Sequence, residues 1–456
     1  MSADKGQSFA PGATIGILGG GQLGRMTALA AVRLGFRTHV FCPEHDAPAA
    51  QVTALSTVAA YNDEEALAAF ADDVDVVTFE FENIPDTTAE FLAAHKPTRP
   101  NPRVLHIAQQ RLREKDFLAS IGVPVTRYLP VASAAALSAA VEKIGPPCIL
   151  KSAQFGYDGK GQVRIAADTD VAEAWGRMGA SLGILEAEVD FALEASVIIA
   201  RGVDGAVALY PPVENRHKHH ILDETIAPAR LAESTVQQAE DTARRIAEAL
   251  DLVGLLAVEL FVTKDGKVLV NELAPRPHNS GHWTIDACVT SQFEQFVRAV
   301  CGLPLGSTAH HSEALMKNLI GDDAGQWREI IRDPDTKLHL YGKADARPER
   351  KMGHVTRLKP HWRAALLLSV QRALLSEIPP RLRAVACGQK ADAFVISFYF
   401  DGDISDSDRE SVSSVETEVL ADLSDNQPLK IECSRCDYPQ PLPLPQNMIL
   451  AYARRE

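Results

Sequence analysis

The sequence predicts a multidomain protein that combines α/β and α+β organisation, and three observations support this. A buried strand at residues 13–18 runs through a glycine turn into a helix and a second strand, which makes a βαβ unit. Two alternating runs on either side of Asp265-Gly266 predict an antiparallel hairpin. A third region, beyond residue 360, has its own helix-like and strand-like runs. The length of 456 residues suggests roughly three domains.

Composition and charge exclude several classes of protein. With 46% hydrophobic and 23% charged residues, the chain resembles ordinary globular proteins. Lys plus Arg at 46 against Asp plus Glu at 60 gives a net charge of -14, which argues against a nucleic-acid or membrane partner. No apolar run approaches the roughly 20 residues of a spanning helix, and residues 1–7 lack a signal-peptide core. We therefore expect a cytoplasmic protein with reduced thiols, including the lone Cys433 and Cys436 pair.

The first βαβ unit carries a G-x-G-x-x-G turn at residues 19–24, followed by a helix to about Leu34. Because a helix N-terminus favours anions, we expect this one to be able to receive a phosphate. The dinucleotide interpretation is weak, since the next strand runs into residues 42–44 without a clear acidic residue at its tip. Gln22 in the turn carries an amide suited to a polar ligand.

Two acidic residues follow the next buried strand of the unit. The strand at residues 74–79 ends in Glu80-Phe81-Glu82-Asn83, and open α/β sheets bind ligands at the carboxyl ends of their strands. The proline-rich run at residues 97–102 then predicts a domain boundary. A basic helix that starts near Arg111 follows and ends at Gly122.

A lysine and a glycine-rich loop come next along the chain. Lys151 ends a strand, and residues 155–162 form a loop in which glycines let backbone N–H groups approach phosphate oxygens and Lys160 adds charge. A flexible hairpin tip is the alternative for this loop taken alone. Together with the acidic hairpin downstream, these residues predict a nucleoside triphosphate site without a P-loop.

That hairpin carries the most informative pair of residues. A two-residue turn at Asp265-Gly266 pairs Lys264 with Lys267 and places Glu259 opposite Glu272, with Cβ atoms ~5 Å apart. Facing carboxylates on an apolar face need neutralising, and Mg²⁺ does this while it accepts substrate phosphates. The alternative is that one glutamate reaches solvent or an Arg or Lys elsewhere. The strand context favours a metal.

Other polar residues lie between these parts. Residues 183–189 and 193–201 read as strands, the first able to bind an adenine edge through its main chain and Glu194 able to bind ribose hydroxyls. His217, His219 and His220 are crowded into a basic segment. We interpret this cluster as an exposed loop and not as a zinc site, because a zinc site needs a fixed ligand geometry.

With these residues in view, the chain resembles the ATP-grasp superfamily and, more closely, the N5-carboxyaminoimidazole ribonucleotide synthetases of purine biosynthesis. The resemblance covers residues 13 to about 358 and is carried by residues 17–26, 156–162, 271–283 and 350–354. It implies a Rossmann-like pre-ATP-grasp domain at 1–100, an ATP-grasp domain at 101–303, a small C-terminal β-rich domain at 304–359 and an additional α/β extension at 360–456.

The resemblance also implies an activity and a set of site residues. Such an enzyme uses MgATP and bicarbonate to carboxylate 5-aminoimidazole ribonucleotide through carboxyphosphate, and it is expected to be a homodimer. The ATP site would comprise Arg111, Lys151, Gly156, Tyr157, Asp158, Gly159, Lys160, Gly161, Gln162, Glu186, Ala187, Glu188, Val189, Glu194, His217, Asn271 and Glu272. The residues expected around bicarbonate and the reacting amine are Glu80, Tyr157, Asp158, Arg276, His278, Asn279, Lys343 and Arg350. Magnesium would bind Glu259 and Glu272, and the aminoimidazole nucleotide would meet Gln22, Leu23, Glu80, Lys343 and Arg350.

Several points stay open at this stage. Glu349 stands where the family usually has glycine, and one additional residue precedes it, so the role of Arg347 is unassigned. Asp158 either orients the amine or also accepts its proton. The extension at 360–456 has a helix-like run from Trp362, a strand at 393–400, an acidic helix at 406–423 and a strand at 429–433. It is either an oligomerisation or partner surface or a structural addition.

Three rival functions follow from the same residues. A related ligase would activate an organic acid in place of bicarbonate. An NAD-dependent dehydrogenase would use the first glycine turn but would leave Lys151, the second glycine loop and both hairpin glutamates unexplained. A nonenzymatic nucleotide-binding regulator would keep the pocket without turnover.

Overall fold

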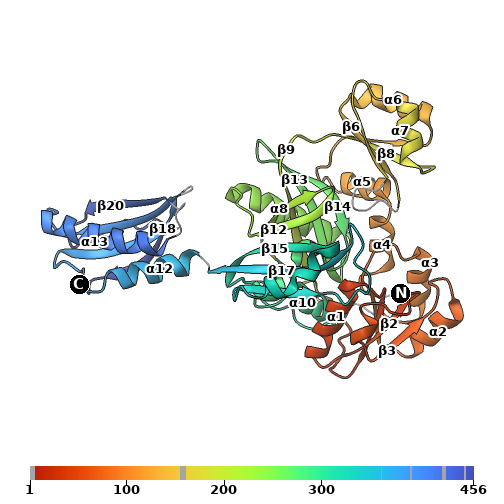
Figure 1. Ribbon diagram of the computed structural model, residues 1–456, viewed down its shortest axis with the longest axis horizontal. Coiled ribbons are helices and arrows are strands. Elements are labelled where there is room, and N and C mark those ends of the chain that lie inside the picture. Colours follow the sequence, from red (N-terminus) through yellow and green to blue (C-terminus); the bar gives the residue numbers. More distant parts are fainter. Residues whose placement is uncertain are drawn as a thin grey trace. The chain divides into compact units, whose positions relative to one another are not determined.

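The structure is a computed structural model, and it describes residues 6–154, 161–360, 362–390, 393–423, 428–445 and 448–455 (Figure 1). The chain divides into two compact units, residues 1–358 and 359–456. Each unit has hydrophobic clusters of its own, which is the property of a separately folded body. No helix of the described residues is long and apolar enough to cross a membrane.

The N-terminal part of the first unit is a parallel sheet with the strand order β3-β2-β1-β4. Strands β1, β2 and β4 are largely buried because helices cover the sheet, whereas β3, at one edge, is mostly exposed. The predicted βαβ unit is present, and its helix starts at Gln22 directly after the glycine turn. The elements are β1 (Thr14–Leu18), α1 (Gln22–Arg33), β2 (Arg37–Cys42), η1 (Ala50–Val52), β3 (Leu55–Val58), α2 (Glu64–Asp72), β4 (Val76–Phe79) and α3 (Asp86–His95).

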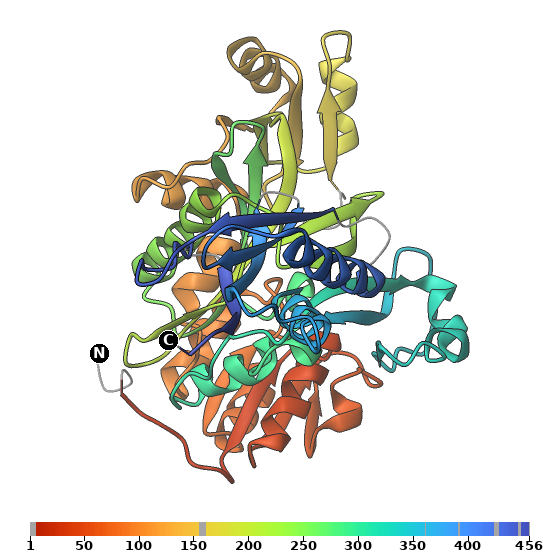
Figure 2. The ribbon, with the colours of Figure 1, turned by 90° about the vertical axis from the view of Figure 1, so that its left-hand side faces the viewer.

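A small antiparallel sheet follows, with the order β5-β8-β6-β7, and it forms the brown and yellow part at the top of Figure 2. Two helices with apolar faces, α6 and α7, pack together on it and close a core of their own. The elements are α4 (Pro102–Ala108), α5 (Arg111–Ser120), β5 (Tyr128–Val131), α6 (Ala134–Ile144), β6 (Cys148–Ser152), β7 (Gln162–Ile165), α7 (Val171–Met178) and β8 (Gly183–Ala187).

A nine-stranded sheet forms the centre of the unit, with β14 at one end and β16 at the other. Alternate residues of β9 serve its two faces: Val197 and Ile199 belong to the cluster under α8, whereas Ile198 and Ala200 belong to the cluster under α10. The elements are β9 (Phe191–Arg201), β10 (Val207–Leu209), β11 (Val213–Lys218), β12 (Ile221–Ala227), α8 (Glu233–Ala249), β13 (Gly254–Thr263), β14 (Val268–Ala274), η2 (Asn279–Gly281), α9 (Thr284–Ala287) and α10 (Gln292–Val300).

The segment expected as a small β-rich domain, 304–359, adds its strands to this same sheet. β15 pairs with β12, and β16 pairs with β17, so these strands do not close a sheet of their own. The elements are β15 (Ser312–Ile320), η3 (Gly321–Gln326), α11 (Trp327–Ile330), β16 (Thr336–Leu340) and β17 (Lys351–Pro360).

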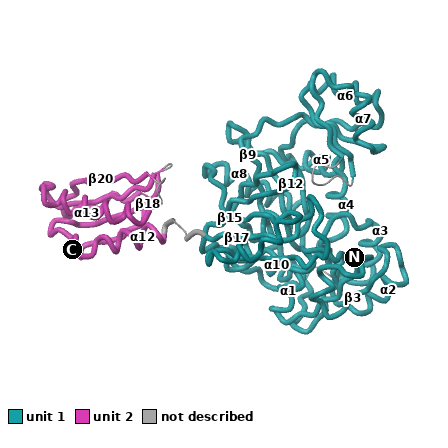
Figure 3. The backbone as a smooth tube through the Cα atoms, in the orientation of Figure 1, with its two compact units in different colours: residues 1–358 teal, residues 359–456 magenta. Residues whose placement is uncertain are grey.

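The second unit, magenta in Figure 3, is a four-stranded sheet with the order β20-β19-β18-β21. Helices α12 and α13 pack together, and their apolar faces join those of β18 and β19 in one core. The sequence did not indicate β18 or β21. The elements are α12 (Trp362–Ala373), β18 (Leu382–Lys390), β19 (Ala393–Phe400), α13 (Asp406–Asp422), β20 (Leu429–Arg435) and β21 (Met448–Ala453).

Candidate active site

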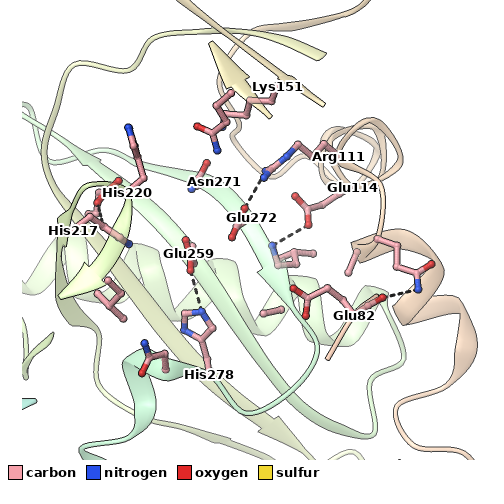
Figure 4. Close-up of a pocket in the computed structure, with 18 of the residues that line it drawn as sticks. Glu82, Arg111, Glu114, Lys151, His217, His220, Glu259, Asn271, Glu272 and His278 are labelled. Carbon is pink, nitrogen blue, oxygen red and sulfur yellow. Dashed lines mark hydrogen bonds and ion pairs between the residues drawn. The ribbon is translucent and has the colours of Figure 1, made fainter. Parts of the chain in front are cut away.

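A cavity of about 670 Å³ lies where the three sheets of the first unit meet. Most of the residues singled out from the sequence line it, and Figure 4 shows their side chains converging from α5, β6, β11, β13 and β14. The lining includes Gln22, Leu23, Glu80, Arg111, Lys151, Gln162, Glu186, Ala187, Glu188, Val189, Glu194, His217, Glu259, Asn271, Glu272, Arg276, His278 and Asn279. The cavity therefore brings together parts of the chain that are up to 329 positions apart in residue number, from Gln22 to Lys351.

The hairpin turn differs from the prediction. The backbone N–H of Thr263 donates to the carbonyl of Lys267 at 2.9 Å, so Lys264, Asp265 and Gly266 form a three-residue loop. Gly266 has φ 78°, the left-handed conformation that commonly ends such loops. The predicted two-residue turn is therefore wrong, because it needs Lys264 and Lys267 to pair.

Glu259 and Glu272 nevertheless face each other, as predicted, because a β-bulge corrects the register. Leu260 pairs with Val270, and Glu259 pairs with Glu272, which leaves Asn271 as an extra residue on β14. The longer loop alone would have placed Asn271 opposite Glu259. The bulge thus restores the pairing that the shorter turn would have given.

Each of the two glutamates already has a neighbouring donor group. His278 Nε2 lies 3.1 Å from Glu259, and Arg111 donates to Glu272 at 3.0 Å (Figure 4). Burial would raise the pKa of Glu259, but the hydrogen bond and charge of His278 lower it to about 2. The arginine partner that the sequence left open as an alternative to a metal is present for Glu272.

The donor atoms around the bulge still fit a hard divalent cation. Two carboxylates face each other, and the Asn271 Oδ1 atom is buried on the same wall without a hydrogen-bond partner. Carboxylate and amide oxygens suit Mg²⁺, which keeps other positions for water or phosphate. Among the described residues no group of three or more His, Cys, Asp or Glu could hold a metal alone. The remaining ligands would have to come from a substrate or solvent.

Lys151 reaches the cavity from β6 and forms a buried ion pair. Its Nζ lies 2.6 Å from Glu186 on the neighbouring strand β8, and Lys115 lies 3.7 Å from the other oxygen of the same carboxylate. Burial would raise the pKa of Glu186, but the two lysines lower it to about 2. This wall therefore presents a fixed ammonium group to the cavity.

At the opposite wall, His217 hydrogen-bonds to Glu194. Burial lowers the pKa of His217, but the hydrogen bond and charge of Glu194 outweigh this and raise the pKa overall. The three histidines are exposed, as predicted, but the prediction of a loop is wrong for His217, which lies in β11; His219 and His220 form the turn, with φ 52° and 64°. His220 also lines the cavity.

The glycine turn before α1 holds a carboxylate of the protein itself. Glu80 accepts hydrogen bonds from the backbone N–H groups of Gly21 and, at 2.6 Å, Gly24. A Cβ atom at Gly21 would lie 2.5 Å from Glu80, so the missing side chain makes room for this carboxylate. Burial raises the pKa of Glu80, although the two backbone hydrogen bonds oppose this. The predicted phosphate position at this helix N-terminus is thus filled by Glu80.

The segment after β14 carries a second buried ion pair. Arg276 donates to both oxygens of Glu82, and the distance for Nη2 is 2.9 Å. This bidentate geometry fixes the orientation of the guanidinium group relative to the carboxylate. Burial would raise the pKa of Glu82, but Arg276 lowers it overall. The amide of Asn279 lines the cavity, and neither its oxygen nor its nitrogen has a partner. A ligand in the cavity could bind both atoms.

Two predicted substrate residues, Lys343 and Arg350, lie between β16 and β17 and do not line the cavity. The Lys343 Nζ donates to the carbonyl of Lys351 at 2.7 Å, and Lys351 does line it. Burial lowers the pKa of Lys343 to about 8, with Arg350 adding to this effect and Glu80 opposing it. Glu349 has φ 65°, which explains why a glycine suits this position.

Gly156, Tyr157, Asp158, Gly159 and Lys160 lie outside the described residues. Gly161 is described but does not line the cavity; it has φ 70° and packs against Ser152.

Sequence reasoning missed two residues beside the site, Glu114 and Lys115. Both are buried on the same face of α5 as Leu118, with the helical spacing of Arg111, Glu114, Lys115 and Leu118. That spacing is readable in the sequence and could have indicated charged groups facing inward.

Three family models match successive parts of the first unit. They are the ribonucleotide synthetase preATP-grasp domain at residues 12–109, the ATP-grasp domain at 116–293 and the phosphoribosylaminoimidazole carboxylase C-terminal domain at 314–366. A fourth model, the MafI2 immunity protein, matches residues 363–456.

Curated relatives and solved structures agree with these matches. An N5-carboxyaminoimidazole ribonucleotide synthase of Brucella melitensis is 48% identical over 355 residues, which cover 77% of this chain and 98% of the relative. A bifunctional purine synthesis protein of Dictyostelium discoideum is 49% identical over 368 residues, or 76% of this chain, which spans 37% of that longer relative. The crystal structure of N5-carboxyaminoimidazole synthase from Aspergillus clavatus with ADP and 5-aminoimidazole ribonucleotide has a TM-score of 0.73 at 31% identity, over 77% of this chain and 94% of that one.

Proposed function

Because the chain belongs to the N5-carboxyaminoimidazole ribonucleotide synthase family, we propose that it carboxylates the exocyclic amine of 5-aminoimidazole ribonucleotide with ATP and bicarbonate. It is an ADP-forming ligase of the ATP-grasp type and acts in purine biosynthesis. The observation that carries the proposal is one cavity that joins the glycine turn and Glu80 to Lys151, Glu186 and the facing glutamates.

We assign ATP to the wall formed by the small and central sheets. Lys151 presents a buried ammonium to the phosphates, and the edge from Glu186 to Val189 supplies main-chain groups to the adenine. Glu194 and His217, already joined by a hydrogen bond, are suited to the ribose hydroxyls. Gly156 to Lys160 lie outside the described residues, and their contact with the phosphates stays a proposal from the sequence.

We assign magnesium to Glu259 and Glu272, with the Asn271 amide oxygen beside them. When bound, the ion neutralises charge on the phosphate oxygens during transfer. Arg111, 3.0 Å from Glu272, keeps this carboxylate in place and adds positive charge on the same side. Glu259 is held ionised by His278, so it is ready to bind a cation at neutral pH.

The chemistry has two steps. A bicarbonate oxygen attacks the γ-phosphorus of ATP, the bond to the β-phosphate oxygen breaks, and ADP and carboxyphosphate form. The amine of the nucleotide then attacks the carboxyl carbon, inorganic phosphate leaves, and the amine loses a proton. Arg276, His278 and the unpartnered Asn279 amide line the same cavity and can bind the anionic groups near the bulge. Asp158 remains the residue proposed to orient the amine or to accept its proton, and Tyr157 is proposed to lie near bicarbonate and the nucleotide; both lie outside the described residues.

We assign the aminoimidazole nucleotide to the side of the cavity that Gln22 and Leu23 line. Glu80 fills the N-terminus of α1, so the nucleotide phosphate needs another cationic site. Lys343 and Arg350 supply it, since both are close enough to interact electrostatically with each other and Lys343 also with Glu80. The carboxylate of Glu80 is then placed to accept a hydrogen bond from the amine or a ribose hydroxyl.

The proposal is tested by following ADP release with and without each cosubstrate. We expect release to require both bicarbonate and 5-aminoimidazole ribonucleotide, with ¹³C from labelled bicarbonate appearing in the product. Equal release with formate or an amino acid in place of bicarbonate would establish the rival ligase. NADH binding without ATP binding would favour the dehydrogenase, and ATP binding without turnover would favour the regulator.

The second unit is proposed to be dispensable for carboxylation. The Brucella relative is matched over 98% of its length by 77% of this chain, which leaves it no counterpart of residues 359–456. The MafI2 immunity protein match favours a separate role for this unit, of the partner-binding kind left open by the sequence. Residues 1–358 should retain the full turnover number. A large loss would show that the second unit takes part in catalysis.

We further propose a homodimer in the cytoplasm, as the family resemblance implies. Light scattering on the full chain and on residues 1–358 measures the assembly. A dimer for both would place the dimer contacts in the first unit, whereas a monomer for the shorter chain alone would give the second unit an oligomerisation role.

A further inference from the structure

The outer edge of β14 is covered mainly by side chains of α5. β14 ends the nine-stranded sheet, and the only backbone pairing on this edge among the described residues is a single parallel bridge between Val270 and Val125, in which the Val270 N–H donates to the Pro124 carbonyl at 2.9 Å. Glu114 accepts the N–H of Leu273 at 2.9 Å. Lys115 donates to the carbonyls of Asn271, at 2.7 Å, and Val270, at 3.2 Å. Two consecutive residues of one helix thus replace part of a neighbouring strand.

Both of these side chains are ionisable and almost fully buried, and burial raises the pKa of Glu114 to about 8 and lowers the pKa of Lys115. Glu114 is 2% exposed and Lys115 1% exposed. Lysine and glutamate are seldom buried so deeply, and apolar residues of similar volume usually give equal or greater stability. One oxygen of Glu114 lacks a partner altogether. Stability alone therefore does not explain this pair.

Their contacts concentrate at the bulge that orients the facing glutamates. Asn271 is the extra residue of the bulge, and Lys115 binds its carbonyl, which no residue of β13 opposes. Leu273, held by Glu114, follows Glu272 directly. If β14 paired regularly with β13, Asn271 would stand opposite Glu259, and Glu272 would move to the other face. The two α5 side chains hold the backbone on both sides of Glu272.

Lys115 also connects the bulge to the phosphate wall. Its Nζ lies 3.7 Å from Glu186, whose other oxygen is 2.6 Å from Lys151. One buried ammonium therefore contacts the strand that carries Glu272 and the carboxylate that holds Lys151.

We propose that Glu114 and Lys115 are positioning residues that hold the bulge at Asn271, and thereby set the Glu272 and Asn271 side chains toward a divalent cation and the Lys151 ammonium toward the phosphates. The inference rests on the proposed function in one respect, the assignment of the cation to Glu259 and Glu272. It adds the backbone device that gives the cation site its shape.

Binding of Mn²⁺ in the presence of ADP, followed by the electron paramagnetic resonance of free Mn²⁺, tests the inference on the full chain. Lys115→Met should weaken Mn²⁺ binding about 10- to 100-fold, the usual effect of removing a group that orients a metal ligand. Glu114→Leu should do the same. Glu114→Gln keeps an oxygen that accepts from Leu273, so Mn²⁺ affinity should remain close to that of the unaltered protein. Hydrogen exchange at the Leu273 amide should be fastest in Glu114→Leu, which loses the acceptor. In Glu114→Gln the exchange rate should stay close to that of the unaltered protein.

Arg99→Met is the matched control. Arg99 is 3% exposed and donates to the carbonyls of Val300 and Gln7, so it is also a buried cation on backbone oxygens, but it does not line the cavity. Its replacement should lower the melting temperature without weakening Mn²⁺ binding.

Equal Mn²⁺ affinity in Lys115→Met, Glu114→Leu and the unaltered protein would overturn the inference. So would equal loss in Glu114→Gln and Glu114→Leu, because the hydrogen bond to Leu273 would then be irrelevant. If Lys115→Met does not fold, the comparison of Mn²⁺ affinity between Glu114→Leu and Glu114→Gln tests the inference by itself. Normal Mn²⁺ binding without bicarbonate-dependent ADP release would contradict the proposed function alone, since the binding comparison does not use turnover.

Discussion

The two units of this chain treat buried charge differently. In the second unit, Arg383 donates to the carbonyls of Cys436 and Gln440, and Asp408 accepts from Ser405. In the first unit, polar atoms of Glu114, Glu186, Asn271 and Asn279 lie buried at or beside the cavity without hydrogen-bond partners. Buried polar atoms are normally paired, and the unpartnered atoms of these four residues gather around one cavity, where a ligand could pair with them; other unpartnered atoms of the first unit, such as Thr38 Oγ1, lie away from it.

Every unpartnered buried side-chain atom found among the described residues belongs to the first unit. The buried charges of the second unit instead make local hydrogen bonds. Arg383 binds the loop carbonyl of Cys436, and Asp408 caps the first turn of α13. Among the described residues, the two units therefore differ in whether buried polar side-chain atoms are left without hydrogen-bond partners. The four predictions below can contradict or refine this contrast.

The largest effect is expected for Glu272→Gln. Loss of one charged ligand for the cation that stabilises phosphoryl transfer should lower the turnover number about 10²- to 10³-fold. The thermal unfolding temperature should change little, because Gln can still accept from Arg111. Glu418→Gln on α13 is the control and should leave turnover unchanged. Full activity of Glu272→Gln would remove Glu272 from the cation site.

Arg383→Met should destabilise the second unit and leave carboxylation intact. The variant loses charged hydrogen bonds to two buried carbonyls, which should lower the free energy of unfolding by about 2–4 kcal/mol. Urea unfolding followed by circular dichroism measures this loss, and ADP release measures function. A matching fall in turnover would show that the second unit supports the active site.

The Michaelis constant for 5-aminoimidazole ribonucleotide should rise with pH. Burial lowers the pKa of Lys343 to about 8, so its ammonium is present below that pH and is lost as the pH rises through it. Between pH 7 and pH 9 the constant should increase roughly tenfold, while that for ATP stays level. Lys343→Arg should flatten this profile, since Arg keeps its charge. An unchanged profile in that variant would contradict a phosphate-binding Lys343.

The smallest effect is expected from relieving backbone strain. Glu349 and Ser376, one in each unit, have φ 65° and 78°, where a side chain costs energy. Replacing either with glycine should stabilise its unit by roughly 0.5–1 kcal/mol in urea unfolding, because the relief exceeds the added entropy of the unfolded chain. Only Glu349→Gly should also alter the Michaelis constant for 5-aminoimidazole ribonucleotide, since Glu349 directly precedes Arg350. Destabilisation by both would show that the side chains offset the strain.

Much of the site was readable because it depends on local pattern. Alternation predicted β13 and β14, and glycine spacing predicted the turn before α1. The facing of Glu259 and Glu272 was predicted from an incorrect turn, and an unpredicted bulge restored it. β18 and β21 were missed because their buried and partly buried patterns lack a clear period of two. The inward face of α5 was missed because charged residues occupy apolar positions.

The sequence by itself determined which residues lie on which strand or helix, and so which of them can share a face. Only the tertiary structure decided their partners. Glu80 and the glycine turn are 56 to 59 residues apart, and Arg111 and Glu272 are 161 apart. Periodicity describes a residue's own element, whereas such contacts depend on how separate elements pack. That packing put a carboxylate where a phosphate was expected, and it gave Glu272 an arginine partner and Glu259 a histidine partner.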